Sequence, residues 1–159
     1  MVSLQNEILN SLWKLLDNNL QYLTNKLTEF TSSQPITRVW KGAAAVIDKY
    51  PAIRIVPQGR DSEWGATRSQ DDTYRFSVEC FIRTTAQPEI AQEWIGAFEA
   101  VVMNLLLEPV NLTLDIGSGL KTYDGYATSG TAPERTGEGI YQANIDVWYK
   151  TWQSPIAVA

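Results

Sequence analysis

The chain has 159 residues, of which 44% are hydrophobic and 11% aromatic, and its formal net charge is −5. A chain of this length can bury roughly 68–70% of its unfolded surface, so one folded domain over residues 1–159 is expected. The acidic balance and the scatter of the thirteen Lys and Arg residues argue against a protein that grips nucleic acid or an anionic membrane.

Metal-ligating and nucleophilic side chains are scarce. Histidine is absent and Cys80 is the only cysteine, so an intrachain disulfide, a Cys-based zinc site and a His-based catalytic triad are excluded. We expect neither a metal nor an organic cofactor. No apolar run reaches about 18 residues and the N-terminus lacks a signal-type segment. The sequence therefore favours a soluble protein made in a cytoplasm, without a membrane partner.

Two helices are predicted from the spacing of apolar residues. The first runs from Ser3 to about Thr28, where no Gly or Pro occurs and leucines recur at steps of three, four or one. Ser3 can cap its start, and Pro35 comes after its end. The second begins near Pro88, which suits the first turn of a helix, and Pro109 stops it.

Strands are predicted where short apolar runs or strict alternations occur. They cover residues 36–40, 52–57, 74–83, 110–114 and 139–152, with a further strand around 120–126. Alternation is cleanest in the third of these, whose predicted core-facing residues are Tyr74, Phe76, Val78, Cys80 and Ile82. The order of elements predicts an α+β fold, in which a mostly antiparallel sheet of about four to five strands carries two helices on one face.

Two segments are predicted to lack regular structure. Residues 58–72 form a polar loop longer than a hairpin needs, and residues 117–139 form a flexible stretch rich in Gly, Ser and Thr. The loop contains one tryptophan, Trp64, which either folds back over the sheet or anchors a protein interface. We favour the interface, because Trp and Arg dominate interface hot spots and a mobile polar loop becomes ordered only against a partner. The predicted interface residues are Arg60, Asp61, Glu63, Trp64, Arg68, Asp71 and Asp72.

Three short motifs suggest chemistry but fit structural roles better. Ser11 and Lys14 match the S-x-x-K pattern of penicillin-binding enzymes, yet they lie inside the predicted first helix and the partner motifs are absent. The Gly-Ser-Gly segment at 117–119 lacks the spacing of a phosphate-binding loop and is typical of a turn. Asp71 and Asp72 lack the third spaced acid of a calcium loop. We therefore predict no catalytic residue and a protein that is not an enzyme.

A series of individually weak features runs in order along nearly the whole chain. They are Val39-Trp40-Lys41-Gly42, Tyr50-Pro51-Ala52-Ile53-Arg54-Ile55, the polar loop, the strand Tyr74 to Ile82, the helix with Trp94 and Phe98, the stretch Ser118 to Tyr126, and the closing strand Ala143 to Tyr149. In this order the chain resembles the tail-terminator proteins of long-tailed phages, of the lambda type. Patterned hydrophobics and turns carry the resemblance, rather than chemical signatures.

The resemblance implies a structural protein of the virion neck. Such a subunit forms a hexameric ring that caps the finished tail tube, stops its polymerisation and presents a surface to the head–tail connector. Its partners are copies of itself, the tail tube protein and the connector, and DNA passes through the ring without specific binding. The family has no catalytic residue to transfer to this chain.

Two other functions stay open. One is that of another neck ring, such as a head–tail connector or tail-completion protein, because the first helix is long and residues 128–138 are extended. The other is that of a small-molecule-binding α+β module, because aromatic residues can line a pocket. A binding module is expected to be monomeric and to hold a small ligand, whereas a terminator is expected to form rings at tube ends.

Overall fold

The computed structural model describes residues 3–30, 35–43, 46–64, 70–116, 121–130 and 134–153. Its helices are α1 (Leu4–Asn18), α2 (Leu20–Phe30) and α3 (Pro88–Leu106), followed by a short 3-10 helix η1 (Pro109–Asn111). Its strands are β1 (Arg38–Lys41), β2 (Ala52–Trp64), β3 (Gln70–Arg83), β4 (Asp124–Ser129), β5 (Glu134–Gly137) and β6 (Ile140–Gln153).

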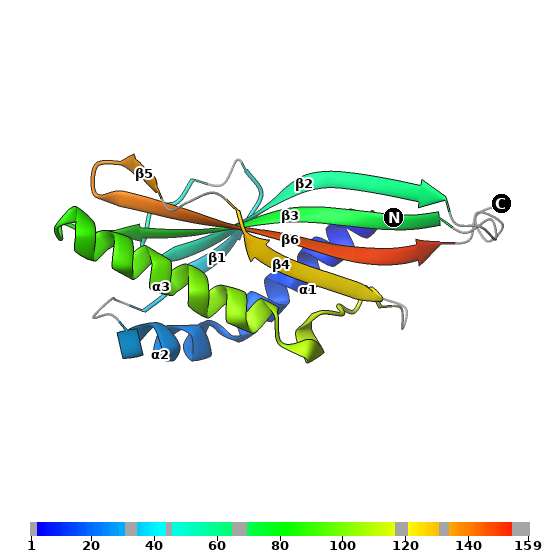
Figure 1. Ribbon diagram of the computed structural model, residues 1–159, viewed down its shortest axis with the longest axis horizontal. Helices are drawn as coiled ribbons and strands as arrows, with labels where there is room; N and C mark the ends of the chain where they lie inside the picture. Colours follow the sequence, from blue (N-terminus) through cyan, green and yellow to red (C-terminus); the bar gives the residue numbers. More distant parts are fainter. Residues whose placement is uncertain are drawn as a thin grey trace.

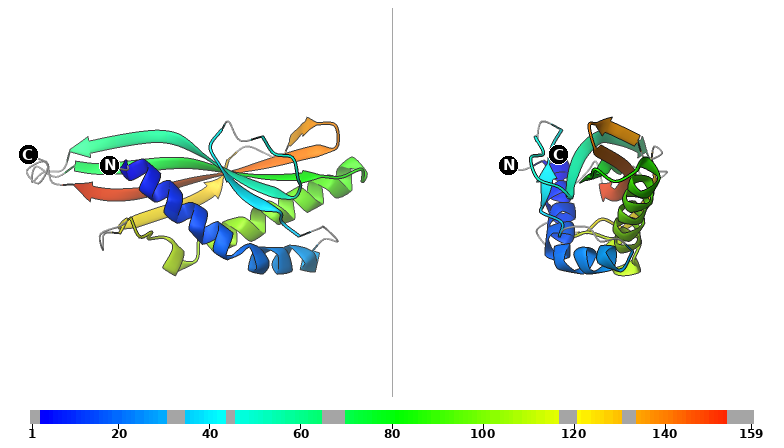
Figure 2. Two further views of the ribbon diagram at one scale, coloured as in Figure 1. Left: turned by 180° about the vertical axis from the view of Figure 1, so that it is seen from behind. Right: turned by 90° about the vertical axis from the view of Figure 1, so that its left-hand side faces the viewer.

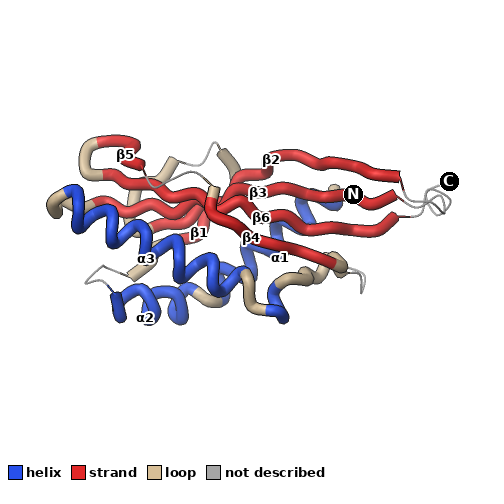
Figure 3. Tube along the Cα trace, in the orientation of Figure 1, coloured by secondary structure: helices blue, strands red, loops and turns tan. Residues whose placement is uncertain are grey.

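The strands form one sheet in the order β1-β2-β3-β6-β4, and β5 pairs with the start of β6 (Figures 1 and 3). β1 runs parallel to β2, whereas every other described pair is antiparallel. The predicted fold class is therefore confirmed: the protein is α+β with a mostly antiparallel sheet. In the described residues the sheet has six strands and the helical layer has three α-helices, slightly more of each than the sequence predicts.

The three helices form a layer on one face of the sheet (Figure 2). α1 packs against β1 and β2, α3 packs against β3, β4 and β6, and α2 packs against α3. The opposite face of the sheet, here called the outer face, carries no helix in the described part of the chain. Among the described helices, none is both long and apolar enough to cross a bilayer.

The core lies between the helical layer and the inner face of the sheet. On β3 the alternate residues from Tyr74 to Ile82 are all buried, as their alternation predicts. α3 contributes Ile95, Phe98 and Val102 from one stripe, and α1 contributes Leu12 and Leu16, all of them fully buried. Each such side chain stabilises the fold by about 1.5–3 kcal/mol relative to an exposed position.

The N-terminal helix is interrupted at Asn19, so the prediction of one continuous helix over residues 3–28 is wrong. Asn19 lies outside helical geometry, with φ −108° and ψ 13°. Its Nδ2 donates a hydrogen bond of 2.7 Å to the Leu15 carbonyl oxygen. An asparagine side chain that takes a backbone acceptor competes with the helix for it, and this competition favours a helix end. After the break, α2 turns across the layer and reaches α3.

The region after α3 also departs from its prediction. The strand predicted at residues 110–114 is instead the helix η1 and a turn, and residues 117–139 contain β4 and β5 rather than one flexible stretch. β4 lacks an apolar alternation because its inward residues are small. A Cβ on Gly125 would lie 2.5 Å from the Leu112 carbonyl oxygen and 2.7 Å from the Tyr149 ring, so no side chain fits there.

Candidate functional site

The predicted loop over residues 58–72 is mostly a β-hairpin. β2 and β3 pair continuously from Ala52 opposite Phe81 to Trp64 opposite Gln70, and β6 runs beside β3 as far as Gln153. Residues 58–64 and 70–72 are strand, so the prediction of a long unstructured loop is wrong for them. Residues 65–69, which include Arg68, lie outside the described residues.

A β-bulge lies where the hairpin leaves the body of the sheet. The register of β2 against β3 shifts between Pro57 and Gly59, and Gly59 has φ +119°, a conformation that favours glycine. Proline is tolerated here because β1 has already ended, which makes this part of β2 an edge strand. In the sequence Pro57 and Gly59 are typical of the start of a loop. They therefore led to the wrong prediction that β2 ends at Pro57.

The inner face of the hairpin is polar, unlike the inner face of the body. Asp72 is fully buried and accepts a hydrogen bond of 2.7 Å from Ser62 Oγ. Thr151, which is opposite Asp72 in the register, and Tyr149 are buried beside it. The Tyr149 hydroxyl and Thr151 Oγ1 have no hydrogen-bond partner among the described residues.

The helical layer reaches the hairpin at Arg60 and Tyr74. These two side chains line a hollow of about 230 Å³ with Ser3, Leu4 and Gln5, so the first turn of α1 lies against them. The hydrogen bond with the Tyr74 hydroxyl raises the pKa of Arg60 above its usual value. Burial raises the pKa of Tyr74, although the hydrogen bond with Arg60 acts in the opposite direction.

Two further buried groups have pKa values well above their usual range. Burial raises the pKa of the Tyr149 hydroxyl, and it raises the pKa of the Cys80 thiol, with the Glu99 and Glu79 carboxylates acting in the same direction. A thiol with a raised pKa is a poor nucleophile, because only the thiolate attacks. Cys80 is thus a small core residue, as the sequence predicts for the inward side of this strand.

The outer face of the sheet combines ion pairs with a pair of aromatic side chains. Arg54 Nε lies 2.7 Å from Glu79 Oε1, and Arg75 Nε lies 2.7 Å from Asp61 Oδ2. Tyr126 on β4 is 51% exposed, and its ring centroid lies 6.2 Å from that of Trp148. Surface aromatics of this kind are enriched in protein interfaces.

The predicted interface residues lie on both faces of the hairpin. Asp61 and Asp71 lie on the outer face, whereas Arg60 and Asp72 alternate with them and lie on the inner face. Asp72 is buried within the subunit and Arg60 is exposed. Among the others, Glu63 and Trp64 lie in β2 with side chains outside the described part, and Arg68 lies wholly outside it. The structure thus separates residues that the sequence grouped.

Sequence reasoning missed Tyr126 and Trp148 as surface residues. They are brought together because β4 pairs with β6 and places Tyr126 directly opposite Trp148. Trp148 lies in the predicted last strand, on the side opposite the alternating apolar residues. That outward position was the feature of the sequence that could have identified Trp148 as a surface residue.

Both edges of the sheet are open at the hairpin end. β1 pairs only with Ala52 to Ile55, so Val56–Trp64 of β2 have no strand on their outer side within the described residues. At the other edge, β4 is the last described strand and pairs only with β6. Unpaired strand edges are ready templates for pairing with another chain.

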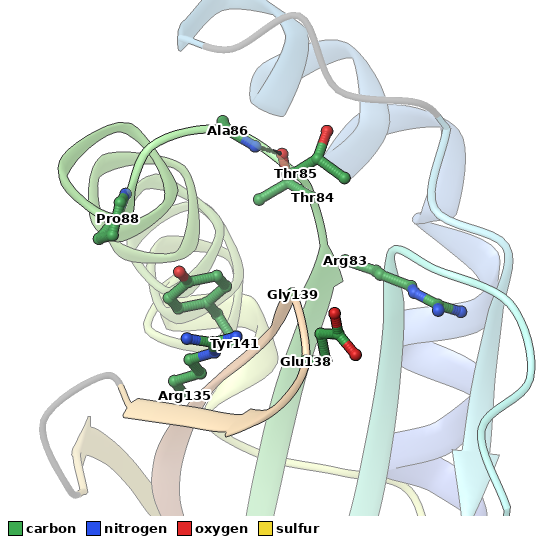
Figure 4. A pocket seen from close by; sticks show the side chains of 9 residues that line it. All are labelled: Arg83, Thr84, Thr85, Ala86, Pro88, Arg135, Glu138, Gly139 and Tyr141. Atoms are coloured by element: carbon green, nitrogen blue, oxygen red, sulfur yellow. Dashed lines mark hydrogen bonds between the residues drawn. The ribbon is translucent and has the colours of Figure 1, made fainter.

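A separate hollow of about 840 Å³ lies at the opposite end of the sheet, beside the start of α3 (Figure 4). Its polar groups do not converge on one point. Figure 4 shows Tyr141 near α3 and Arg83 extending away from it, and Arg135 Nε already donates to the Gly137 carbonyl oxygen at 3.0 Å. In the described residues, no group of three His, Cys, Asp or Glu side chains is placed to hold a metal ion.

No protein-family model matches the chain, and no curated protein matches it.

Proposed function

We propose that this protein is a structural protein of the phage virion neck: a tail terminator that forms a ring, caps the tail tube and joins it to the head–tail connector. The observation that carries the proposal is that the sheet, as far as the structure describes the chain, has two different open edges on opposite sides of one subunit. A head-to-tail contact uses both edges of every copy, and repeated rotation about one axis closes such contacts into a ring.

The surface chemistry supports an assembly role. Tyr126, which is exposed, and Trp148, which is half-buried, form an aromatic pair next to one open edge. Beside the other edge, the Arg75–Asp61 pair neutralises its own charges. An aromatic centre with paired charges around it is common in protein interfaces.

The charge of the chain supports a ring through which DNA slides. The net charge is −5, and on the outer face Arg54 and Arg75 are each paired with a carboxylate. Lasting contact with DNA requires unpaired cations that displace counterions from the phosphates. A lumen lined by this protein would repel DNA weakly and would not hold it.

The same edges would also serve another ring of the neck, such as a head–tail connector. The two roles differ in what the ring binds: a terminator binds the end of a tail tube, whereas a connector binds the head portal. We favour the terminator because the order of features along nearly the whole chain resembles that family.

Electron microscopy of a phage that lacks this gene tests the proposal. We expect tail tubes that grow past their normal length and heads without tails, because nothing stops tube polymerisation. Purified protein added to these tubes should appear as a ring at one end. Tubes of normal length in the deletion strain, or a protein that joins heads instead of tube ends, would contradict the terminator assignment.

A variant with a shortened hairpin tests whether the end of the hairpin is needed for capping. Replacing residues 62–72 by Asn-Gly connects Asp61 to Thr73 through a two-residue turn that suits an antiparallel pair. We expect this variant to fold, since the apolar core lies in the body, and to lose capping. Normal capping by the folded variant would show that the hairpin end is only a spacer.

A further inference from the structure

The two open edges are placed to pair with each other between copies. We infer that Val56–Trp64 of β2 in one subunit pairs with β4 of the next subunit as antiparallel strands, so that the sheet continues around the ring. This inference rests on the proposed ring and names the surface that closes it. Its occupant is a second copy of this chain.

The two open edges lie at the same height on the sheet. Asp61 is opposite Thr73, Thr73 is opposite Lys150, and Lys150 is opposite Asp124. Residues 61 and 124 therefore stand in one row across four strands. The next row on the same face runs through Gly59, Arg75, Trp148 and Tyr126. A neighbour added beside the sheet needs little shift along the strands for its open edge to meet this one.

The strand directions also match. Each step from β2 to β3, from β3 to β6 and from β6 to β4 is antiparallel, so β2 and β4 run in opposite directions. Rotation about an axis along the strands preserves these directions. It therefore sets β4 of one copy antiparallel to β2 of the next, the arrangement whose hydrogen bonds lie straight across the pair. A two-fold contact between two β2 edges would leave both β4 edges unpaired.

The remaining parts of the edges are already covered within the subunit. β1 occupies the side of β2 at Ala52–Ile55, and β5 occupies the side of β6 at Ile140–Gln142. The contact between copies is thus confined to the hairpin end, over Asp124–Thr128 of β4, because Ser129 is level with Ile55, which β1 covers. This restriction fixes the height of the contact.

The side chains along the two edges are partly complementary. Tyr126 is exposed on β4, and the position level with it on β2 is Gly59, where no atom lies within 4 Å of the site a Cβ would take. An aromatic ring laid over a glycine on a neighbouring strand is a stabilising cross-strand arrangement.

The acids along the two edges have the opposite effect. Asp61 and Asp124 are both exposed and share one row, so a level pairing brings two carboxylates together, although Arg75 offsets part of the Asp61 charge. Charged side chains on open strand edges commonly prevent those edges from pairing with another chain too early. We therefore expect free subunits to associate weakly and to close into a ring on the tube.

Paired cysteines test the contact directly. Asp61→Cys with Asp124→Cys in one chain places two thiols on opposed strands, where Cα atoms of a direct pair lie about 4.5–5.5 Å apart and within disulfide reach. Cys80 is buried and stays unreactive. Oxidation at graded concentrations should give a ladder from dimer to closed ring. A mixture of the two single variants should give only dimers that contain one of each.

A mismatched pair is the control. Asp61→Cys with Thr128→Cys uses the same strands, but residues 124 and 128 are about 13 Å apart along β4, which is too far for a level contact. This pair should give little cross-linking. Equal cross-linking of both pairs, no cross-linking of the level pair, or dimers of a single variant with itself would overturn the inference.

A charge reversal gives an independent measurement. Asp124→Lys should face Asp61 and lower the dissociation constant of self-association about fivefold in sedimentation experiments. Asp48→Lys makes the same charge change at an exposed residue away from both edges and should leave the constant unchanged. Equal effects of the two variants would mean that net charge, and not the edge contact, controls association.

The outcomes separate this inference from the proposed function. Rings on tube ends without cross-linking of the level pair would preserve the terminator and refute the edge contact. A full ladder from a protein that never binds tube ends would preserve the edge contact and refute the terminator.

Discussion

The same three strands, β2, β3 and β6, behave differently in the body of the sheet and in the hairpin. In the body their inward residues are apolar and face the helical layer, and Val78 and Ile145, which lie opposite one another, are fully buried there. In the hairpin the inward residues are Arg60, Asp72 and Tyr149, and α1 covers only the first of these rows. A continuous ladder of backbone hydrogen bonds thus joins a region held by burial to a region held by polar contacts.

This difference indicates that the body provides stability, whereas the hairpin provides a specific arrangement of strands. Burial in the body gives most of the free energy of folding and fixes the sheet. Polar pairs in the hairpin add little net stability, but they specify one arrangement because each donor needs its acceptor. The hairpin is then a preformed arm with an open edge, rather than the mobile loop that its composition predicts.

The largest expected effect lies in the body. Phe98→Ala removes a fully buried ring of α3 and should lower the free energy of unfolding by about 3–5 kcal/mol. Ile90→Ala, on the exposed side of the same helix, should change it by less than about 0.5 kcal/mol. Urea unfolding followed by circular dichroism measures both. A small effect of Phe98→Ala would mean that the helical layer does not hold the sheet.

The next effect lies in the hairpin. Asp72→Ala removes the buried carboxyl group that accepts the hydrogen bond of the Ser62 hydroxyl, and it should cost about 1–3 kcal/mol. Hydrogen exchange should locate the change, with faster exchange of hairpin amides and unchanged exchange in α3. Equal acceleration in both regions would show that the hairpin and the body unfold as one unit, and the comparison would fail.

A smaller pair of effects with opposite signs concerns two tyrosines in one row. Tyr149→Phe removes a buried hydroxyl that lacks a described partner and should raise the free energy of unfolding by about 1 kcal/mol. Tyr74→Phe removes a hydroxyl that is hydrogen-bonded to Arg60 and should lower it by about 1 kcal/mol. Thermal melting of the two variants gives the signs. Equal signs would contradict this hydrogen-bond assignment.

The smallest effect appears in alkaline solution. The folded protein raises the pKa of Tyr149, so the folded state keeps a proton that the unfolded state loses above about pH 10. Stability from this group is complete below pH 10 and decreases as the pH rises, by about 0.4 kcal/mol at pH 10 itself. The decrease should be smaller in Tyr149→Phe. Urea unfolding between pH 8 and pH 11 measures it.

The fold was predictable where the burial of one face gives the sequence a regular spacing of apolar residues. The inward side of β3 from Tyr74 to Ile82, the stripe of α3 and the alternation of β6 identify an α+β core, and the structure confirms it. The hairpin was not predictable in this way. Its inward residues, Ser62 and Asp72, are polar, so its strands carry no apolar alternation.

Which strand edges stay open was beyond sequence reasoning for a different reason. An open edge depends on which strands pair and where each strand ends. The local spacing of apolar residues predicts neither of these. β4 was difficult to place because the small residues Gly125 and Ala127 face inward, and at Gly125 the Tyr149 ring leaves no room for a side chain. Only the register shows that Tyr126 and Asp61 lie at opposite edges of one sheet at nearly one height.

The break at Asn19 has a mechanical consequence. Because α1 turns into α2 there, one segment braces β1 and β2 at one edge and then reaches α3 beneath β4 at the other. In a ring joined edge to edge, tension around the ring pulls across the strands, along the hydrogen bonds of the sheet. The angled pair of helices offers that load a second path from edge to edge, so the tension is divided between the ladder and the brace.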